Sequence, residues 1–224
     1  MSRADFDKFS HDYEDILSAQ LHFFETDSDY FAEYKVQLTR QLVGAEAATI
    51  LDYGCGTGRS VKHLRRYFPG SKVVGVDVSG GSLSVARREN PGVEFFAPEY
   101  LPGAHHFDLI FLAGVFHHIA PERRAATMRA CAERLSPNGH LVIFEHNPYN
   151  PVTRRVVKSC PFDRDAQLVR RRELVSLAQR SGLAVRHAWY TLFFPGALGW
   201  MRPLEQYLTK VPLGGQYLVH ACRP

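Results

Sequence analysis

The stretch ILDYGCGTGRS, from Ile50 to Ser60, places three glycines on alternate positions between an apolar run and a basic segment. Glycine has no Cβ and adopts positive φ at little cost, so this loop can turn sharply and let a ligand lie against its backbone. A helix that follows such a loop presents free N–H groups toward the ligand. A simple tight turn would explain a glycine loop equally well, so the surrounding elements must decide.

Strand and helix patterns alternate on both sides of this loop. Apolar runs predict seven strands, and amphipathic segments predict helices between most of them. The strands are expected at 49–51, 72–78, 93–96, 107–113, 140–145, 183–194 and 216–221, and the helices at 60–67, 82–90, 121–135 and 171–181, after two or three N-terminal helices within 5–43. The alternation predicts an α/β fold: a seven-stranded, mostly parallel, doubly wound (Rossmann-like) sheet with helices on both faces.

Length and composition favour one domain. The chain has 224 residues, of which 45% are hydrophobic, and this is enough for a single sizeable core. Its four cysteines show no paired spacing, which argues against a disulfide framework and fits a reducing cytoplasm. The longest nearly apolar run, 109–116, is far shorter than the roughly 20 residues of a membrane helix. We therefore expect a cytoplasmic protein without a stable membrane span.

Charge is unevenly distributed along the chain. Residues 1–46 carry ten acidic and four basic side chains, whereas residues 150–186 carry nine basic and three acidic ones. A basic cluster could meet nucleic acid, but no aromatic side chains are interleaved with it as a stacking surface for bases requires. We interpret it as a solvated helix face and expect no nucleic-acid partner. The cluster consists of Arg154, Arg155, Lys158, Arg164 and Arg170 to Arg172.

An acidic residue ends the second predicted strand. The stretch KVVGVDVS contains Asp77, 23 residues after Gly54. In dinucleotide-binding folds a carboxylate at this place accepts hydrogen bonds from the hydroxyls of a ribose. The same residue could instead be only a helix cap or a turn residue. The glycine spacing differs from the G-x-G-x-x-G of nicotinamide enzymes, because Gly58 follows Gly56 after one residue.

These motifs resemble those of the class I S-adenosylmethionine-dependent methyltransferases. The resemblance rests on ILDYGCGTG, VVGVDVS, FDLIFLAGVFHHI and LSPNGHLVIFEH, and it covers residues 45–146 closely. It implies S-adenosylmethionine as the cofactor and a last strand antiparallel to the others. It also implies one domain over 1–224, made of an N-terminal helical lid (1–46), a cofactor-binding core (47–146) and a C-terminal substrate-side half (147–224).

The resemblance assigns roles to individual positions. The glycine loop is expected to receive the methionine moiety, Asp77 the ribose, and Val78 with residues 97–99 the adenine. Many relatives have an aspartate where this chain has Ala97, so adenine recognition should depend on backbone groups or on Glu99. Cys55 is interpreted as a small packing residue of the loop. The cofactor-binding candidates are Tyr13, Asp52, Gly54, Cys55, Gly56, Gly58, Asp77, Val78, Ala97, Pro98, Glu99 and Ala113.

Histidines follow the fourth and fifth predicted strands. Methyl transfer from a sulfonium needs a base only where the acceptor carries a proton, as an alcohol does. Members of the family face the acceptor at this place, where an imidazole with a pKa near 6.5 could take the proton. We predict His118 or His146 as the base, with His117 third, and expect the two adjacent rings to point in different directions. Packing or a local hydrogen bond is the alternative role for each. No metal site is expected, because no acidic or cysteine ligand has the right spacing.

The predicted reaction is O-methylation of a small-molecule acceptor, in secondary or cell-envelope metabolism. In relatives the acceptor is covered by segments that correspond here to FDKFSHDYED, HNPYNPVTRR and LFFPGALGWMRPL. The third is unusually apolar, so it could clamp an aromatic or lipid-like acceptor, pack in the core, or form a homodimer contact. The alternatives are methylation of carbon or nitrogen, a non-methylating reaction, and a non-catalytic binding role. An RNA or protein methyltransferase is disfavoured, because the sequence has no N-P-P-Y tetrad.

Overall fold

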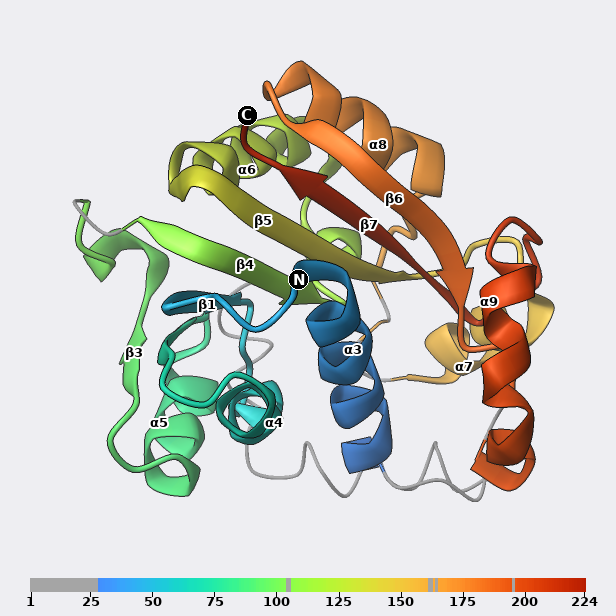
Figure 1. The fold of residues 1–224 in the computed structure, drawn as a ribbon, viewed down its shortest axis with the longest axis horizontal. Coiled ribbons are helices and arrows are strands. Elements are labelled where there is room, and N and C mark those ends of the chain that lie inside the picture. The colour runs from blue at the N-terminus through green and yellow to red at the C-terminus, as the bar shows by residue number, and fades with distance from the viewer. Residues whose placement is uncertain (1–27, 104–105, 161–162, 164, 195) are drawn as a thin grey trace.

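A computed structural model describes residues 28–103, 106–160, 163, 165–194 and 196–224 of the chain. Its centre is a seven-stranded sheet with the order β3-β2-β1-β4-β5-β7-β6 (Figure 1). The strands are β1 (Thr49–Tyr53), β2 (Lys72–Val76), β3 (Glu94–Phe96), β4 (Phe107–Ala113), β5 (Leu135–His146), β6 (Ala184–Thr191) and β7 (Gln216–Cys222). Strands β1 to β5 pair in parallel, and β7 runs antiparallel to both β5 and β6. The predicted mostly parallel, Rossmann-like sheet with an antiparallel last strand is therefore confirmed.

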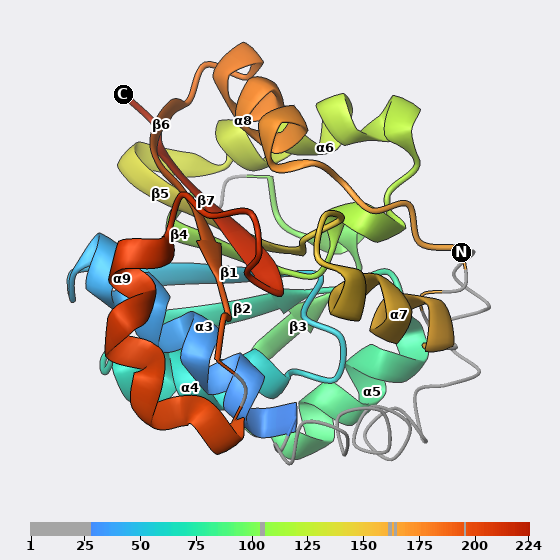
Figure 2. The same ribbon diagram turned by 90° about the vertical axis from the view of Figure 1, so that its right-hand side faces the viewer.

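Helices cover both faces of this sheet. They are α3 (Ser28–Val43), α4 (Arg59–Tyr67), α5 (Gly80–Glu89), α6 (Pro121–Glu133), α7 (Pro151–Ser159), α8 (Arg171–Arg180) and α9 (Glu205–Leu208). Figure 2 shows α6 and α8 on one side of the sheet and α3, α4 and α5 on the other. Each side has its own buried apolar cluster, one with Met128 and Leu174 and the other with Val36, Leu64 and Leu83. The sheet is thus buried from both sides at its centre.

The central strands read as continuous apolar runs because both of their faces are covered. Ile50 and Leu51 on β1 are both fully buried although they point to opposite faces, and so are residues 109–112 on β4. Helix α5 begins after Ser79, whose side chain accepts a hydrogen bond from the backbone N–H of Ser82. These local signals explain why the alternating elements could be predicted.

The predicted and observed elements differ mainly in the second half of the chain. Strand β5 begins at Leu135, earlier than predicted, because its pairing with β4 continues across an irregularity in register. Strand β6 ends at Thr191, earlier than predicted, since Leu192 has a φ of 61° and the chain turns toward the 3-10 segment η5 (Gly196–Leu204). Helix α7 lies where only a covering segment was predicted. Of the N-terminal helices, α3 is observed, and residues 5–27 lie outside the described residues.

The basic segment is largely solvated, as predicted. Arg154, Arg155, Lys158, Arg170 and Arg172 are exposed. Arg171 is the exception, because its guanidinium donates to the carbonyl oxygen of Ala188 and lies 4.3 Å from the centre of the Tyr190 ring. Arg171 therefore links α8 to β6 through its side chain. Within the described part of the chain, no helix has the length and apolar character needed to cross a bilayer.

Candidate functional site

The glycine loop connects β1 to α4 at the carboxyl end of β1. Gly54, Gly56 and Gly58 have φ values of 76°, 53° and 81°, a region that favours glycine. At Gly54 a Cβ atom would lie 2.5 Å from Cγ2 of Val115, so any other residue there would have to displace the Val115 side chain. At Gly56 a Cβ would meet nothing within 4 Å. The loop therefore turns sharply and leaves open space against its backbone at Gly56.

The Asp77 carboxylate holds this loop in position. Its Oδ2 accepts a hydrogen bond from the backbone N–H of Gly56 at 2.8 Å, and its Oδ1 accepts one from Ser79 at 2.9 Å. The hydrogen bond from Ser79 corresponds to the alternative role of Asp77 as a turn residue, which the sequence left open. The first places the carboxylate beside the glycine loop, as a ribose-binding role requires.

Two buried polar atoms beside the loop test whether a polar cofactor fits there. Among the described residues, Oδ2 of Asp52 and Oγ1 of Thr57 are buried without a hydrogen-bond partner. Burial, and then the nearby Asp77 carboxylate, raises the pKa of Asp52 to about 7. A ligand with ammonium and hydroxyl donors would satisfy both atoms and lower this pKa again. S-adenosylmethionine, with its amino-acid and ribose groups, fits these requirements.

The adenine candidates follow β2 and β3 at the same edge of the sheet. Val78 is 48% exposed, an unusual exposure for a valine beside a buried strand. Pro98 and Glu99 lie in η2 (Pro98–Tyr100), where Glu99 is exposed. Ala97 is buried in the core, so its own side chain offers little contact area to a ligand.

Three further residues were predicted to bind the cofactor: Cys55, Ala113 and Tyr13. Cys55 is buried in the apolar cluster, where burial raises the pKa of its thiol well above the usual value. Ala113, the last residue of β4, is partly buried. Tyr13 lies outside the described residues.

The three predicted histidines come together at the carboxyl ends of β4 and β5. His117 and His118 lie in η3 (Phe116–His118), just beyond β4, and His146 is the last residue of β5. The centre of the His117 ring lies 4.1 Å from that of His118 and 5.0 Å from that of His146. Two carboxylates that the sequence did not indicate, Glu145 and Asp163, complete this histidine cluster.

His117 is buried between these two carboxylates. Its Nδ1 lies 2.7 Å from Oε2 of Glu145, and its Nε2 lies 3.3 Å from Oδ1 of Asp163. Burial acts to lower the pKa of His117, but Glu145 and Asp163 outweigh it and raise that pKa to about 10. His117 is therefore an imidazolium at neutral pH, with both nitrogens protonated. Both carboxylates thus disfavour the neutral ring that a general base requires and favour a positioning role for His117.

The charge of His117 keeps its two neighbours neutral. Burial, and then the positive His117, lowers the pKa of His118 to about 3 and the pKa of His146 to about 4. The expected pKa near 6.5 is thus not found at any of the three histidines. The expectation of divergent rings is also wrong, because Nε2 of His117 and Nε2 of His118 both lie 3.3 Å from Oδ1 of Asp163. The tight turn of η3 places the two successive rings on the same side.

The histidine cluster contains a set of atoms able to bind metal. Nε2 of His117, Nε2 of His118 and Oδ1 of Asp163 lie within 4.8 Å of one another. From the sequence we expected no acidic ligand, because no acidic residue has metal-ligand spacing from these histidines along the chain. Asp163 reaches them from the segment after α7, which is distant in the sequence. A protonated nitrogen has no lone pair for a cation, so the imidazolium at His117 opposes metal binding here. Ion pairing alone accounts for the positions of these side chains.

Lys35 on α3 brings positive charge to the same region. Burial, and then the nearby Arg59, lowers the pKa of Lys35 to about 8, while Glu145 acts in the opposite direction. The sequence held two signals for such residues: Glu145 is a charged residue at the end of the apolar run of a predicted strand, and Lys35 lies within an apolar helical stripe. No signal pointed to Asp163. Its segment is held against η3 by a 2.8 Å hydrogen bond from the backbone N–H of Gln167 to the carbonyl oxygen of His117.

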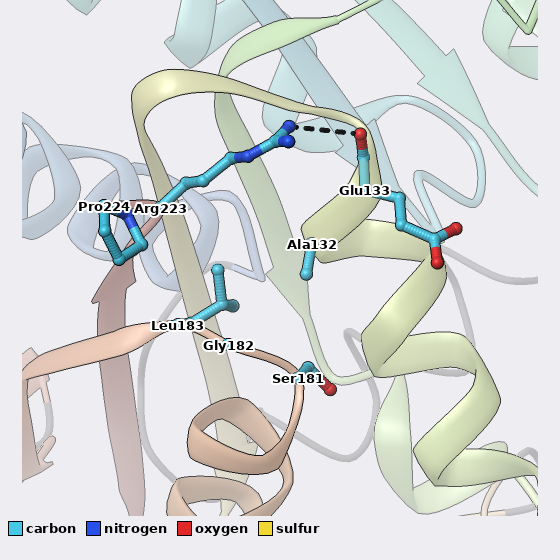
Figure 3. Close-up of a pocket in the computed structure, with 7 residues that line it drawn as sticks. All are labelled: Ala132, Glu133, Ser181, Gly182, Leu183, Arg223 and Pro224. Atoms are coloured by element: carbon cyan, nitrogen blue, oxygen red, sulfur yellow. Dashed lines mark hydrogen bonds between the residues drawn. The ribbon is translucent and has the colours of Figure 1, made fainter.

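A shallow depression of about 230 Å³ lies elsewhere on the molecule (Figure 3). It is lined by the end of α6, the turn before β6 and the last two residues of the chain, Arg223 and Pro224. These segments mark the amino end of β5 and β6. The depression therefore lies at the amino ends of the parallel strands, whereas the glycine loop and the histidine cluster lie at their carboxyl ends.

A family model described as a methyltransferase domain matches residues 25–188. The chain belongs to the methyltransferase domain family. The chain is 30% identical to the trans-aconitate 2-methyltransferase of Azoarcus sp. over 71% of its own length and 62% of that protein. It is 32% identical to the trans-aconitate 2-methyltransferase of Methylobacterium nodulans over 53% and 47% of the two chains. The alignments thus span less than two thirds of the length of these relatives.

Solved structures share the fold of this methyltransferase. A methyltransferase from Archaeoglobus fulgidus that depends on S-adenosylmethionine superimposes with a TM-score of 0.68 at 16% identity, over 91% of this chain and 97% of the other. One from Mesorhizobium loti gives a TM-score of 0.62 at 22% identity, over 86% and 98%. The family match and the sheet order agree in giving the chain a methyltransferase domain with the fold of class I S-adenosylmethionine-dependent methyltransferases.

Proposed function

We propose that this methyltransferase transfers the methyl group of S-adenosylmethionine to an oxygen atom of a small-molecule acceptor, and that this oxygen belongs to a carboxylate. The geometry of the histidine cluster carries the proposal. The rings of His118 and His146 lie 4.1 Å and 5.0 Å from the ring of the ion-paired His117, whose charge lowers the pKa of both, and general-base catalysis works best with a pKa near the working pH. A carboxylate needs no base, since it is already ionised at neutral pH. The names of the trans-aconitate 2-methyltransferase relatives support an acceptor of this class.

The cofactor would supply an activated methyl group on a sulfonium. Asp52 and Thr57 would meet donors of its amino-acid part, Asp77 its ribose hydroxyls, and Val78 its adenine. The residues of this chain then contribute alignment and exclusion of water, which supply much of the rate of an in-line displacement. His117 holds its two neighbouring rings in place at the mouth of this site.

Lys35 would provide the counter-charge for the acceptor. Its side chain is partly buried and lies close enough to Arg59 and Glu145 for both charges to act on it, and a charge-assisted hydrogen bond to a carboxylate is worth about 1.5–3 kcal/mol. Replacing it, as Lys35→Met, should raise KM for a carboxylate acceptor about 10- to 150-fold and leave the affinity for S-adenosylmethionine unchanged. Lys35→Arg should restore part of the loss. An unchanged KM in Lys35→Met would remove this residue from the acceptor site.

A hydroxyl acceptor is the second candidate, favoured by the neutral imidazoles of His118 and His146 beyond β4 and β5. If one of them takes the proton, its replacement by glutamine should lower kcat about 10²- to 10⁴-fold without changing cofactor affinity. With a carboxylate acceptor, we expect both variants to keep kcat within about tenfold, since only alignment is lost.

The chemistry of the product separates the two acceptors. The protein is incubated with methyl-labelled S-adenosylmethionine and a panel of di- and tricarboxylates and hydroxy compounds. Mild alkali releases labelled methanol from a methyl ester but not from an ether. We expect the label to be released as methanol. Label retained as an ether supports the hydroxyl candidate instead, and label on nitrogen or carbon contradicts O-methylation.

Several finer expectations stay predictions. Trp200 and Tyr207 are each 76% exposed on η5 and α9, and such apolar exposure supports an aromatic or lipid-like acceptor or a homodimer contact. A role in secondary or cell-envelope metabolism, the cytoplasmic location and the single-domain organisation are likewise still to be tested. The four cysteines are all free, which agrees with a reducing compartment.

A further inference from the structure

Two histidines and a cysteine meet on the paired strands β5 and β7. His140 lies directly opposite Cys222, and His220 is two residues earlier on β7, so the three side chains project from the same face of the sheet. His140 precedes His146 by six residues on β5, which corresponds to roughly 20 Å along a strand. This group is therefore separate from the histidine cluster at the carboxyl end of β5.

The three ligand atoms of this group converge on one point. Nδ1 of His140 lies 3.0 Å from Nε2 of His220, and Sγ of Cys222 lies 3.3 Å from the first atom and 3.6 Å from the second. In a tetrahedral zinc site, bond lengths of about 2.0–2.1 Å to nitrogen and 2.3 Å to sulfur place neighbouring ligand atoms roughly 3.3–3.6 Å apart. The observed triangle thus has nearly the size of one face of a tetrahedron around a zinc ion.

We propose that His140, His220 and Cys222 form a binding site for Zn²⁺, with a solvent molecule as the fourth ligand. Two imidazoles and a thiolate are a ligand set that zinc prefers over the hard cations Mg²⁺ and Ca²⁺. Cys222 is a free cysteine, and His220 and Cys222 are buried while His140 is only partly buried. The ion would reach the site from the His140 side.

Hydrogen bonds explain this arrangement less well than a cation does. Each neutral imidazole nitrogen is either a donor or an acceptor and the thiol carries one hydrogen, so no arrangement of hydrogens gives all three contacts a hydrogen and a lone pair of their own. A metal ion instead accepts a lone pair from each of the three atoms at once. The antiparallel pairing of β5 and β7 also fixes the ligands before any ion binds, since all three stand on hydrogen-bonded strands. The site would therefore cross-link the last strand to the parallel part of the sheet.

Cobalt(II) is a suitable probe, because it replaces zinc in tetrahedral sites and has an electronic spectrum. The purified protein is stripped with a chelator and titrated with Co²⁺ alone, without cofactor or acceptor. We expect saturation at one equivalent, visible bands typical of tetrahedral cobalt, and a near-ultraviolet band from charge transfer between thiolate and metal. Added Zn²⁺ should displace the cobalt and abolish these bands.

Matched variants assign the ligands. Cys222→Ser should abolish the thiolate charge-transfer band, whereas Cys131→Ser, which changes another buried free cysteine, should retain it. His140→Ala should weaken Co²⁺ binding at least about tenfold. Because His140 is only partly buried, this substitution should disturb folding less than a substitution at the buried His220 or Cys222. In each case thermal unfolding confirms that the variant is folded.

Three outcomes would overturn the proposal: no charge-transfer band in the wild type, a band that survives in Cys222→Ser, or cobalt affinity unchanged in His140→Ala. Zn²⁺ should also raise the melting temperature of the wild type but not that of Cys222→Ser. Because the readouts are spectra and melting temperatures of the protein without cofactor, they do not depend on the proposed methyl transfer.

Discussion

At the scale of single residues, the protonation of His117 decides the chemistry of its surroundings. The buried Glu145 and the partly buried Asp163 favour the charged form of His117, and its charge then helps to keep His118 and His146 neutral. The ion pairs thus disfavour His117 as a general base, and its positive charge lowers the basicity of its two neighbours. The same ion pairs make the folded state sensitive to pH, because the pKa values of all participants differ between the folded and unfolded chain.

The first prediction concerns this pH dependence, measured with His117→Gln. The pKa of His117 is raised from 6.5 to about 10, so its stabilisation is complete below pH 6.5 and is lost as the pH rises through about 10. The pKa of Glu145 is lowered from 4.5, and that of Asp163 from 3.8 to about 2, so their stabilisation is lost as the pH falls below these ordinary values. The destabilisation caused by His117→Gln should therefore be largest between about pH 4.5 and 6.5 and shrink toward pH 10.

Its size follows from the burial of the pair. Breaking a buried ion pair costs about 3–5 kcal/mol, which lowers the melting temperature of a chain of this length by roughly 6–20 °C. The measurement is thermal unfolding across this pH range, with His106→Gln at an exposed position as the control. A difference between wild type and His117→Gln that does not change with pH would show that His117 is not charged in the folded protein.

The second prediction is that Asp77→Ala weakens the binding of S-adenosylmethionine. The variant loses the contacts of a carboxylate to ribose and the hydrogen bond that holds Gly56 at 2.8 Å. Losing charge-assisted hydrogen bonds should cost about 1.5–3 kcal/mol, or about 10- to 150-fold in Kd. Calorimetric titration measures this, with a melting curve to show that the variant is folded. An unchanged Kd would exclude Asp77 from the cofactor site.

At the scale of elements, the unit of β1, glycine loop and α4 joins backbone geometry to ligand binding. Each glycine in the loop has a positive φ, but the space around Gly54 is filled by Val115 and the space around Gly56 is open. The two positions therefore have different functions. Gly54 is required for packing against the segment after β4, and Gly56 leaves room for whatever binds over the loop.

The third prediction uses this difference. Gly56→Ala should destabilise the protein by only about 1–2 kcal/mol, the cost of a left-handed conformation in a residue with a Cβ. Gly92→Ala is the matched control, because Gly92 has a φ of 81° and also nothing within 4 Å of a Cβ, but lies in the turn between α5 and β3. Both variants should lose similar stability, and only Gly56→Ala should lose affinity for S-adenosylmethionine, by at least about tenfold. Equal affinities in the two variants would place the cofactor elsewhere.

At the scale of the whole molecule, positive charge occurs in two different settings. Arg154 and Arg155 on α7 are exposed, whereas burial lowers the pKa of Lys35 on α3. Salt screens exposed charges strongly over a Debye length of about 10 Å at 0.1 M, but screens buried ones much less. The two settings therefore predict different dependences of acceptor binding on ionic strength.

The fourth prediction follows from that contrast. If Lys35 holds the acceptor, KM should change by less than about threefold between roughly 0.05 and 0.5 M salt. The double variant Arg154→Gln/Arg155→Gln should leave KM and its salt dependence unchanged. A steep rise of KM with salt that disappears in the double variant would show instead that the exposed face of α7 attracts the acceptor.

The sequence by itself determined the alternating elements, the antiparallel end of the sheet through the family resemblance, and the places of the glycine loop and Asp77. These features depend on periodicity and turn chemistry among neighbouring residues, which can be followed along the chain. Only the tertiary structure decided that Asp163 meets His117, that Lys35 approaches Glu145, and that Cys222 lies opposite His140. Charges, pKa values and ligand sets depend on burial and on contacts between distant segments, and strand pairing creates those contacts without leaving a local pattern.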